Sequence, residues 1–123
     1  MRILIVEDEL ILAADLEYQL TSLGHQVIGI AESAEQALEL ARRGNPDLIT
    51  MDFQLQGRMS GGELAKGLHE ITGARIIYIT AFPGALLRDR ERDPSAICIE
   101  KPFTGRQIAA AVDTATTQRS SDE

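Results

Sequence analysis

The chain has few of the residues that mark several common protein classes. Its 123 residues include one cysteine, no tryptophan, two tyrosines and three phenylalanines. The single cysteine, Cys98, excludes an internal disulfide framework, and no cluster of Cys and His has the spacing of a zinc site. The first apolar run, Ile3 to Val6, meets acid too early for a signal peptide, and no run approaches the length of a membrane span. We therefore expect a cytoplasmic protein that does not enter membranes.

Positive charge is also scarce. Twelve Lys and Arg stand against 19 Asp and Glu, so the net charge is −7. A domain that binds duplex DNA normally carries a basic face, which this composition does not supply, so we expect no DNA binding. The 44% of hydrophobic and 25% of charged residues are typical of one soluble globular domain.

Short apolar runs alternate with helical periodicity along the chain. Residues 3–6 are typical of a strand that is buried on both faces. The next stretch carries a helical stripe that Gly24 ends, namely Leu12, Leu16, Leu20 and Leu23. Further strands are expected at 26–31, 47–53, 76–80 and 96–100, and further helices at 33–44, 60–71, 84–92 and 104–115. We expect one domain over residues 1–117 and a frayed polar tail over 118–123.

Three of the expected helices begin with the capping-box pattern, in which two side chains satisfy each other's free backbone N–H groups. The pairs are Ser33 with Gln36, Ser60 with Glu63, and Thr104 with Gln107. Strands that alternate with helices predict an α/β fold, with a parallel sheet covered by helices on both faces. Five such strands favour a doubly wound, flavodoxin-like sheet of order 2-1-3-4-5, and ligands of these sheets bind beyond the carboxyl ends of the strands.

Reactive side chains follow several of the expected strands. They are Glu7, Asp8, Asp52, Thr80 and Lys101. Clustered carboxylates repel one another unless a cation joins them, and an oxygen-only set suits Mg²⁺. A carboxylate can attack a phosphoryl group to form an aspartyl phosphate, while an ammonium and a hydroxyl stabilise the phosphoryl oxygens. This combination indicates phosphoryl transfer.

Five short motifs resemble those of a known family. They are Glu7-Asp8, Asp52 after an apolar strand, Met59-Ser60-Gly61, Thr80-Ala81 and Lys101-Pro102-Phe103. Together, in this order and at these strand ends, they resemble the receiver domain of two-component response regulators over about residues 2–116. The resemblance implies that Asp52 accepts a phosphoryl group from a sensor histidine kinase or a phosphotransfer protein. It implies a phospho-accepting signalling domain that acts on a downstream protein, not a dedicated enzyme.

The resemblance also implies a metal site. Asp8 and Asp52 would ligate Mg²⁺ together with the backbone carbonyl of Gln54, and Glu7 would act directly or through water. Lys101 would pair with the phosphoryl oxygens, and the hydroxyl of Thr80 would move inward to bond one of them. The Lys101–Pro102 peptide bond would be cis, as is typical of the family.

Two departures from the family pattern affect the switch. Gln56 replaces a frequent proline after the acceptor, and Gly61 lies one position later than usual. Cys98 stands where the family usually has an aromatic residue that rotates on phosphorylation, so Phe82 or Tyr78 would have to substitute for it. The stretch from Thr80 to Pro83, with residues 52–55, resembles receivers of α-proteobacterial general stress regulators.

Several alternatives remain open at this stage. The chain resembles a stand-alone receiver that forms a weak homodimer through its fourth helix, fifth strand and fifth helix. A second hypothesis is a pseudo-receiver that binds proteins without being phosphorylated. A small hydrolase is disfavoured because Gln54 stands where such enzymes have a general acid, and a flavin domain because the first loop is acidic.

The remaining polar candidates have simpler interpretations. His25 and His69 are expected at the surface, and Cys98 is expected to be a small buried hydrophobic residue. Asp8 alone would cap the next helix. The alternating charges of residues 88–93 indicate either a solvated face or a partner surface.

Overall fold

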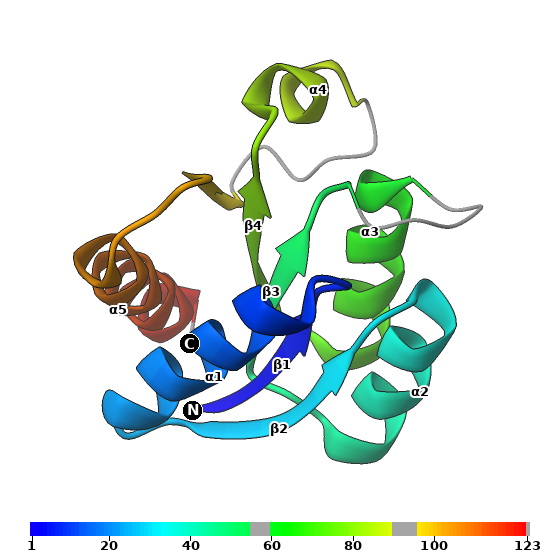
Figure 1. Cartoon of the computed structure of the whole chain (residues 1–123). Coiled ribbons are helices and arrows are strands. Elements are labelled where there is room, and N and C mark those ends of the chain that lie inside the picture. The colour runs from blue at the N-terminus through cyan, green and yellow to red at the C-terminus, as the bar shows by residue number, and fades with distance from the viewer. Residues whose placement is uncertain (55–59, 90–95, 123) are drawn as a thin grey trace.

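The computed structural model describes residues 1–54, 60–89 and 96–122, which form a sheet flanked by helices (Figure 1). Its strands are β1 (Arg2–Val6), β2 (Gln26–Ala31), β3 (Leu48–Asp52), β4 (Arg75–Thr80) and β5 (Ile97–Glu100). Its helices are α1 (Leu10–Ser22), α2 (Ala34–Gly44), α3 (Gly61–Thr72), α4 (Pro83–Arg88) and α5 (Gly105–Asp122). The sheet order is β2-β1-β3-β4-β5 with every pair parallel, which confirms the predicted doubly wound topology.

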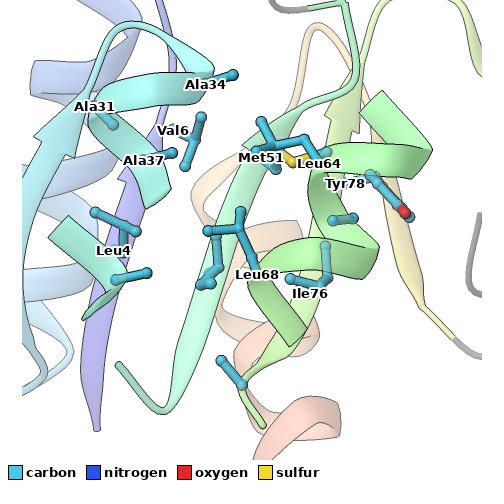
Figure 2. Close-up of a cluster of buried hydrophobic side chains, with 14 of the residues drawn as sticks. Leu4, Val6, Ala31, Ala34, Ala37, Met51, Leu64, Leu68, Ile76 and Tyr78 are labelled. Carbon is cyan, nitrogen blue, oxygen red and sulfur yellow. The ribbon is translucent and has the colours of Figure 1, made fainter. Parts of the chain in front are cut away.

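The sheet is buried on both faces because its central strands are largely apolar. Successive side chains of a strand point to opposite faces, so Ile3 and Ile5 pack with α1 and α5, while Leu4 and Val6 pack with α2 and α3. Figure 2 shows the second cluster, in which Leu64 and Leu68 of α3 meet side chains of the sheet. Burial on both faces holds the carboxyl ends of β1, β3 and β4 in fixed relative positions.

The helix starts follow the predicted caps, with one variation. At α5 the box is reciprocal, since Gln107 N donates to Thr104 Oγ1 (3.2 Å) and Thr104 N donates to Gln107 Oε1 (2.7 Å). At α2 the Ser33 hydroxyl accepts from Gln36 N (3.2 Å), but Gln36 Oε1 accepts from Glu32 N (2.7 Å). At α3 the Ser60 hydroxyl accepts from Glu63 N (3.1 Å).

Some boundaries differ from the predicted ones. The predicted fourth helix over 84–92 ends at Arg88, because Asp89 takes an extended conformation with ψ 118°. The last helix runs to Asp122 instead of giving way to a tail at 118, since residues 106–122 contain neither glycine nor proline. In α1, Ala13 is buried while Leu23 is 46% exposed, so the stripe is shifted. In the described part of the chain, no helix combines the length and apolarity needed to cross a membrane.

Candidate functional site

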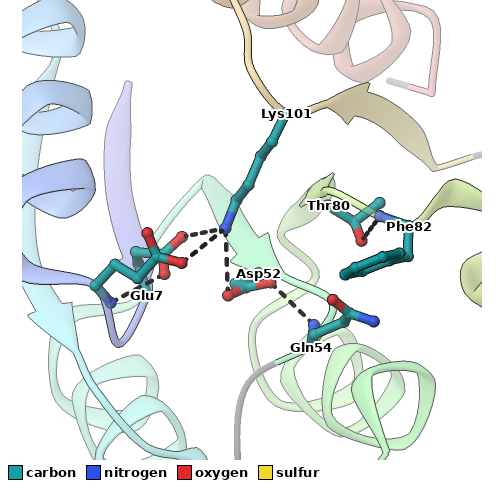
Figure 3. A network of polar contacts seen from close by, with 7 residues as sticks. Glu7, Asp52, Gln54, Thr80, Phe82 and Lys101 are labelled. Atoms are coloured by element: carbon teal, nitrogen blue, oxygen red, sulfur yellow. Dashed lines mark hydrogen bonds and ion pairs between the residues drawn. The ribbon is translucent and has the colours of Figure 1, made fainter.

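Polar side chains meet at the edge of the sheet where the strands end. Glu7 directly follows β1, Asp52 ends β3, Thr80 ends β4, and Lys101 directly follows β5. Glu7, Asp52 and Thr80 are all buried, unlike most polar residues at strand ends. Figure 3 shows Lys101 reaching across this edge toward Glu7 and Asp52. The fold therefore brings together four of the predicted site residues from four different strands.

The ammonium of Lys101 lies among carboxylates. Lys101 Nζ is 3.3 Å from Glu7 Oε1, 3.5 Å from Asp52 Oδ2 and 3.9 Å from Glu9 Oε1. The backbone holds this side chain in place, since Lys101 N donates to Thr80 O (2.8 Å). The Lys101–Pro102 peptide bond is cis. The Lys101 ammonium thus lies close to the Asp52 carboxylate, where it would also contact the oxygen atoms of a phosphoryl group bound to Asp52.

Three carboxylates form a group that can hold a cation. Glu7, Asp8 and Asp52 each offer one oxygen atom, and these atoms lie within 4.8 Å of one another. Glu7 and Asp52 are buried and Asp8 is exposed, so the group opens to solvent on one side. Gln54 N donates to Asp52 Oδ1 (2.9 Å), which places the Gln54 backbone next to the same carboxylate. An oxygen-only donor set with an open side fits Mg²⁺, which keeps several of its waters.

The charges of the site perturb its titratable groups. The pKa of Glu7 is raised to about 7, chiefly by burial and also by the negative charge of Asp52, against the lowering effects of Glu9 N–H and Lys101. Burial alone would lower the pKa of Lys101, but attraction by Asp52, Glu7 and Glu9 outweighs it and the pKa is raised. Lys101 therefore stays charged, while Glu7 is poised near neutrality and would be ionised by a bound cation.

Thr80 is engaged with the segment that leads into α4. Its hydroxyl oxygen accepts a hydrogen bond from Phe82 N (3.0 Å), and the residue is fully buried (Figure 3). The Phe82 side chain is 60% exposed. Tyr78 is buried, with its ring at 87° to that of Phe53 and 5.7 Å away between centroids. Of the two aromatic residues considered as substitutes at the switch, Phe82 is therefore the one that is exposed and joined to Thr80.

Cys98 is exposed, so the expectation of a buried side chain is wrong. Its strand, β5, lies at the edge of the sheet and pairs with β4. Because successive side chains of a strand point to opposite faces, Ile99 is buried and Cys98 is exposed. Partial burial and the neighbouring Glu100 carboxylate raise the pKa of the Cys98 thiol, which disfavours the reactive thiolate. Nothing in this position points to redox chemistry.

The other predicted residues lie as follows. His69 is exposed, as expected, and its Nδ1 lies 2.8 Å from Ala74 O. His25 is half-buried, against expectation, with Nδ1 3.0 Å from the amino group of Met1. Gln56, Met59 and residues 90–93 lie outside the described residues.

The sequence analysis missed one member of the site, Glu9. Its backbone N–H donates to Glu7 Oε2 (3.1 Å), and its carboxylate faces Lys101. The run of three acids at positions 7–9 was the available signal. The sequence analysis gave the capping role to Asp8, whereas in the structure Glu9 occupies the N-cap position of α1 without a side-chain cap hydrogen bond.

Comparison with known proteins agrees with this geometry. A family model described as the response regulator receiver domain matches residues 3–113. The phyllosphere-induced regulator PhyR of Methylorubrum extorquens is 37% identical over 114 residues, which are 92% of this chain and 42% of PhyR. The chemotaxis protein CheY of Bacillus subtilis is 31% identical over 114 residues, 91% of this chain and 94% of CheY.

Solved structures show the same relationship. The crystal structure of the response regulator PhyR from Brucella abortus superimposes with a TM-score of 0.86 at 32% identity, over 98% of this chain and 49% of that one. The chain thus spans about half the length of the PhyR proteins that it matches. The family match, together with the edge where the Asp52 and Lys101 side chains meet, shows that the chain belongs to the response regulator receiver domain family and is related to PhyR-type stress regulators.

Proposed function

We propose that this chain is a switch that accepts a phosphoryl group on Asp52 from a sensor histidine kinase or a phosphotransfer protein, in a reaction that depends on Mg²⁺. The observation that carries the proposal is the contact of Lys101 Nζ with Asp52 Oδ2 at 3.5 Å, beside a three-carboxylate group able to hold a cation. If the contact between Lys101 and Asp52 served only to stabilise the fold, the neighbouring carboxylates of Glu7 and Asp8 would not be needed. The set as a whole matches the requirements of phosphoryl transfer to a carboxylate.

The chemistry follows from these positions. An oxygen of Asp52 forms a bond to phosphorus while the bond between phosphorus and the donor nitrogen of a phosphohistidine breaks. The new phosphoryl group adds close to two negative charges, which Lys101 neutralises in part. The Thr80 hydroxyl donates to a phosphoryl oxygen once it turns toward Asp52. Glu7, Asp8 and Asp52 would hold Mg²⁺, which would neutralise part of the charge of the phosphoryl group.

A partner surface adjoins the site. Leu10 is 65% exposed and Ile11 is 89% exposed, at the start of α1 and directly after the acidic run. Exposed large apolar side chains that cluster beside a reactive centre are typical of a protein interface. We propose that a phosphate donor docks here, and that a downstream protein reads the phosphorylated state. The −7 net charge favours protein partners over DNA.

The experiment that tests the proposal is intact-mass spectrometry after incubation with acetyl phosphate, with and without Mg²⁺. We expect one phosphoryl adduct that requires Mg²⁺ and is absent from Asp52→Asn. Asp113→Asn, an exposed acid on α5, is the matched control and should be labelled like the parent chain. Labelling that survives Asp52→Asn would place the acceptor elsewhere.

A second candidate function is a pseudo-receiver that binds its partner without phosphorylation. The exposed Cys98, at the position where the family usually has the switch aromatic, favours this alternative. The same mass-spectrometry experiment, combined with a Mg²⁺ titration, distinguishes the two functions. A chain that neither takes up phosphate nor binds Mg²⁺ would be a binding module, and a Mg²⁺-dependent adduct on Asp52 would exclude that role as the main one.

A further inference from the structure

Helix α4 is the least anchored helix beside the site. It has six residues, and only Leu86 among them is buried. Leu87 is 67% exposed, and Phe82 just before the helix is 60% exposed. Figure 1 shows α4 projecting beyond the end of β4, away from the sheet that the other helices cover. A helix this short with one buried side chain gains little from packing, so polar contacts at its ends decide its position.

Within the described residues, α4 has a polar contact at each of its ends. At its start, Phe82 N donates to Thr80 Oγ1 at 3.0 Å. At its end, Asp89 accepts a hydrogen bond through Oδ2 from Gly62 N at 3.2 Å. The first contact joins α4 to a residue of the phosphorylation site. The second joins it to the first turn of α3, 27 positions earlier in the chain.

The start of α3, where Asp89 makes its contact, favours a carboxylate. The first N–H groups of a helix have no partner within the helix and carry partial positive charge, so an anion there is stabilised. Ser60 takes the N–H of Glu63, and Asp89 takes that of Gly62. A Cβ atom on residue 62 would lie 2.6 Å from Asp89 Oδ1, so only glycine leaves room for the carboxylate in this place.

We infer that Asp89 is a positioning residue whose contact with the start of α3 restrains α4 in the unphosphorylated chain. This inference rests on the proposed function, in which the Thr80 hydroxyl turns toward a phosphoryl group on Asp52. Since Phe82 N is bonded to that hydroxyl oxygen, either the bond breaks or Phe82 follows it. The first outcome releases the start of α4 and the second displaces it, while the Asp89 contact restrains the other end of the helix.

Hydrogen exchange measured by NMR on the unphosphorylated chain tests the restraint. Asp89→Ala removes the acceptor, and Gly62→Ala pushes the carboxylate away without changing the charge. We expect both variants to lower the protection of the Phe82 and Ala85 amides by roughly tenfold, the effect of losing one charge-assisted hydrogen bond. Phe82 lies at the opposite end of α4 from the change, so a purely local role of Asp89 would leave its amide protection unaltered.

Glu63→Ala is the matched control, because it removes an exposed carboxylate from the same turn of α3. It should leave the Phe82 and Ala85 amides as protected as in the parent chain. Unchanged protection in both Asp89→Ala and Gly62→Ala would overturn the restraint. A loss of protection in Glu63→Ala equal to that in Asp89→Ala would also overturn it, since charge alone would then explain the effect.

The rate of phosphorylation by acetyl phosphate tests the link to the site. A restraint on the resting state lowers the population competent to be phosphorylated, so its removal should speed adduct formation several-fold in Asp89→Ala. Loosened α4 amides with an unchanged rate would overturn the link. If the parent chain took up no phosphate, the proposed function would fail, while the exchange measurement would still decide whether Asp89 restrains α4.

Discussion

Lys101 is a single residue on which the balance of charge in the site depends. It is 16% exposed and faces two buried carboxylates, those of Glu7 and Asp52. In Lys101→Ala these carboxylates repel each other without compensation, so the free energy of unfolding without Mg²⁺ should fall by about 1–3 kcal/mol. Mg²⁺ binding should persist and become at least as tight, since a competing positive charge is gone. Urea unfolding with and without Mg²⁺ measures both effects.

Lys66→Ala serves as the control for that prediction. Lys66 is the other lysine of the chain and lies exposed on α3. Its removal should change the free energy of unfolding by less than about 0.5 kcal/mol. Loss of Mg²⁺ binding in Lys101→Ala would show that the lysine organises the carboxylates instead of opposing the cation.

Glu7 gives the chain without Mg²⁺ a characteristic pH dependence. Its pKa is raised from 4.5 to about 7 in the folded state, first by burial. An acid with a raised folded pKa destabilises the fold as it ionises, so this contribution grows from about pH 4.5 to about pH 7 and is constant outside that range. The full cost is on the order of 3 kcal/mol. Glu7→Gln should remove it, as urea unfolding in a chelator at about pH 5 and pH 8 would measure.

A matched substitution at Glu70, which is exposed on α3, distinguishes the effect of Glu7 from the effect of removing any one negative charge. Glu70→Gln should keep the pH dependence of the parent chain. Equal slopes of stability against pH in Glu7→Gln and in the parent would mean that other groups carry the pH dependence.

At the residue scale, the sequence predicted where the reactive side chains would meet but not how each is held. Glu7, Asp52, Thr80 and Lys101 lie at one edge of the sheet because each stands at or directly after the end of a parallel strand, which the apolar runs of the sequence indicate. Cys98 was misplaced because an apolar run on an edge strand looks the same as one on a central strand. The distances from Lys101 to its carboxylates depend on three separate strands, which no local pattern contains.

At the element scale, the start of α3 lies close to Phe53, the residue directly after β3. A Cβ atom on Gly61 would lie 2.5 Å from both the ring Cδ2 and the carbonyl oxygen of Phe53. Since a backbone carbonyl yields little, Gly61→Ala should lower the free energy of unfolding by about 1–3 kcal/mol. The Phe53 ring, which packs edge-on against Tyr78, would have to move as well. Chemical denaturation measures the change.

The same helix offers the opposite case for comparison. A Cβ atom on Gly67 would meet only Leu38 Cδ2, at an ordinary 3.9 Å. Gly67 lies within α3, where alanine is a better helix former, so Gly67→Ala should stabilise the chain by roughly 0.5–1 kcal/mol. If both substitutions changed stability in the same direction, the close approach of α3 to Phe53 would not be what requires glycine at position 61.

Element boundaries show what local patterns contain and what they lack. The starts of α2, α3 and α5 were predictable, because a capping serine or threonine acts within one turn of the chain. The end of α4 was not, because Asp89 leaves the helix to reach Gly62, a residue distant in sequence. The sheet order was predictable because the alternation of strands and helices, together with the rules of crossover handedness, leaves few arrangements.

At the scale of the whole molecule, excess negative charge and the site act in the same direction. The chain carries a net charge of −7, and three of its carboxylates converge at one edge of the sheet. Any added salt screens the general repulsion, but a cation bound at that edge also removes the local repulsion among Glu7, Asp8 and Asp52. The two effects can be separated, because screening acts on every surface charge and binding acts on one group.

Mg²⁺ should therefore raise the unfolding temperature more than NaCl of the same ionic strength. At a hundredfold excess of Mg²⁺ over its dissociation constant, linkage gives about 2.7 kcal/mol of added stability. Asp8→Asn should remove most of this gain, because it removes one of the three carboxylates that would hold the cation. Asp8 is the exposed member of the group, so the substitution leaves the two buried carboxylates in place. Asp113→Asn, on α5, removes one negative charge as Asp8→Asn does, and it should keep the gain. Equal responses to Mg²⁺ in the two variants would show that Mg²⁺ acts by screening and that the convergent carboxylates hold no cation.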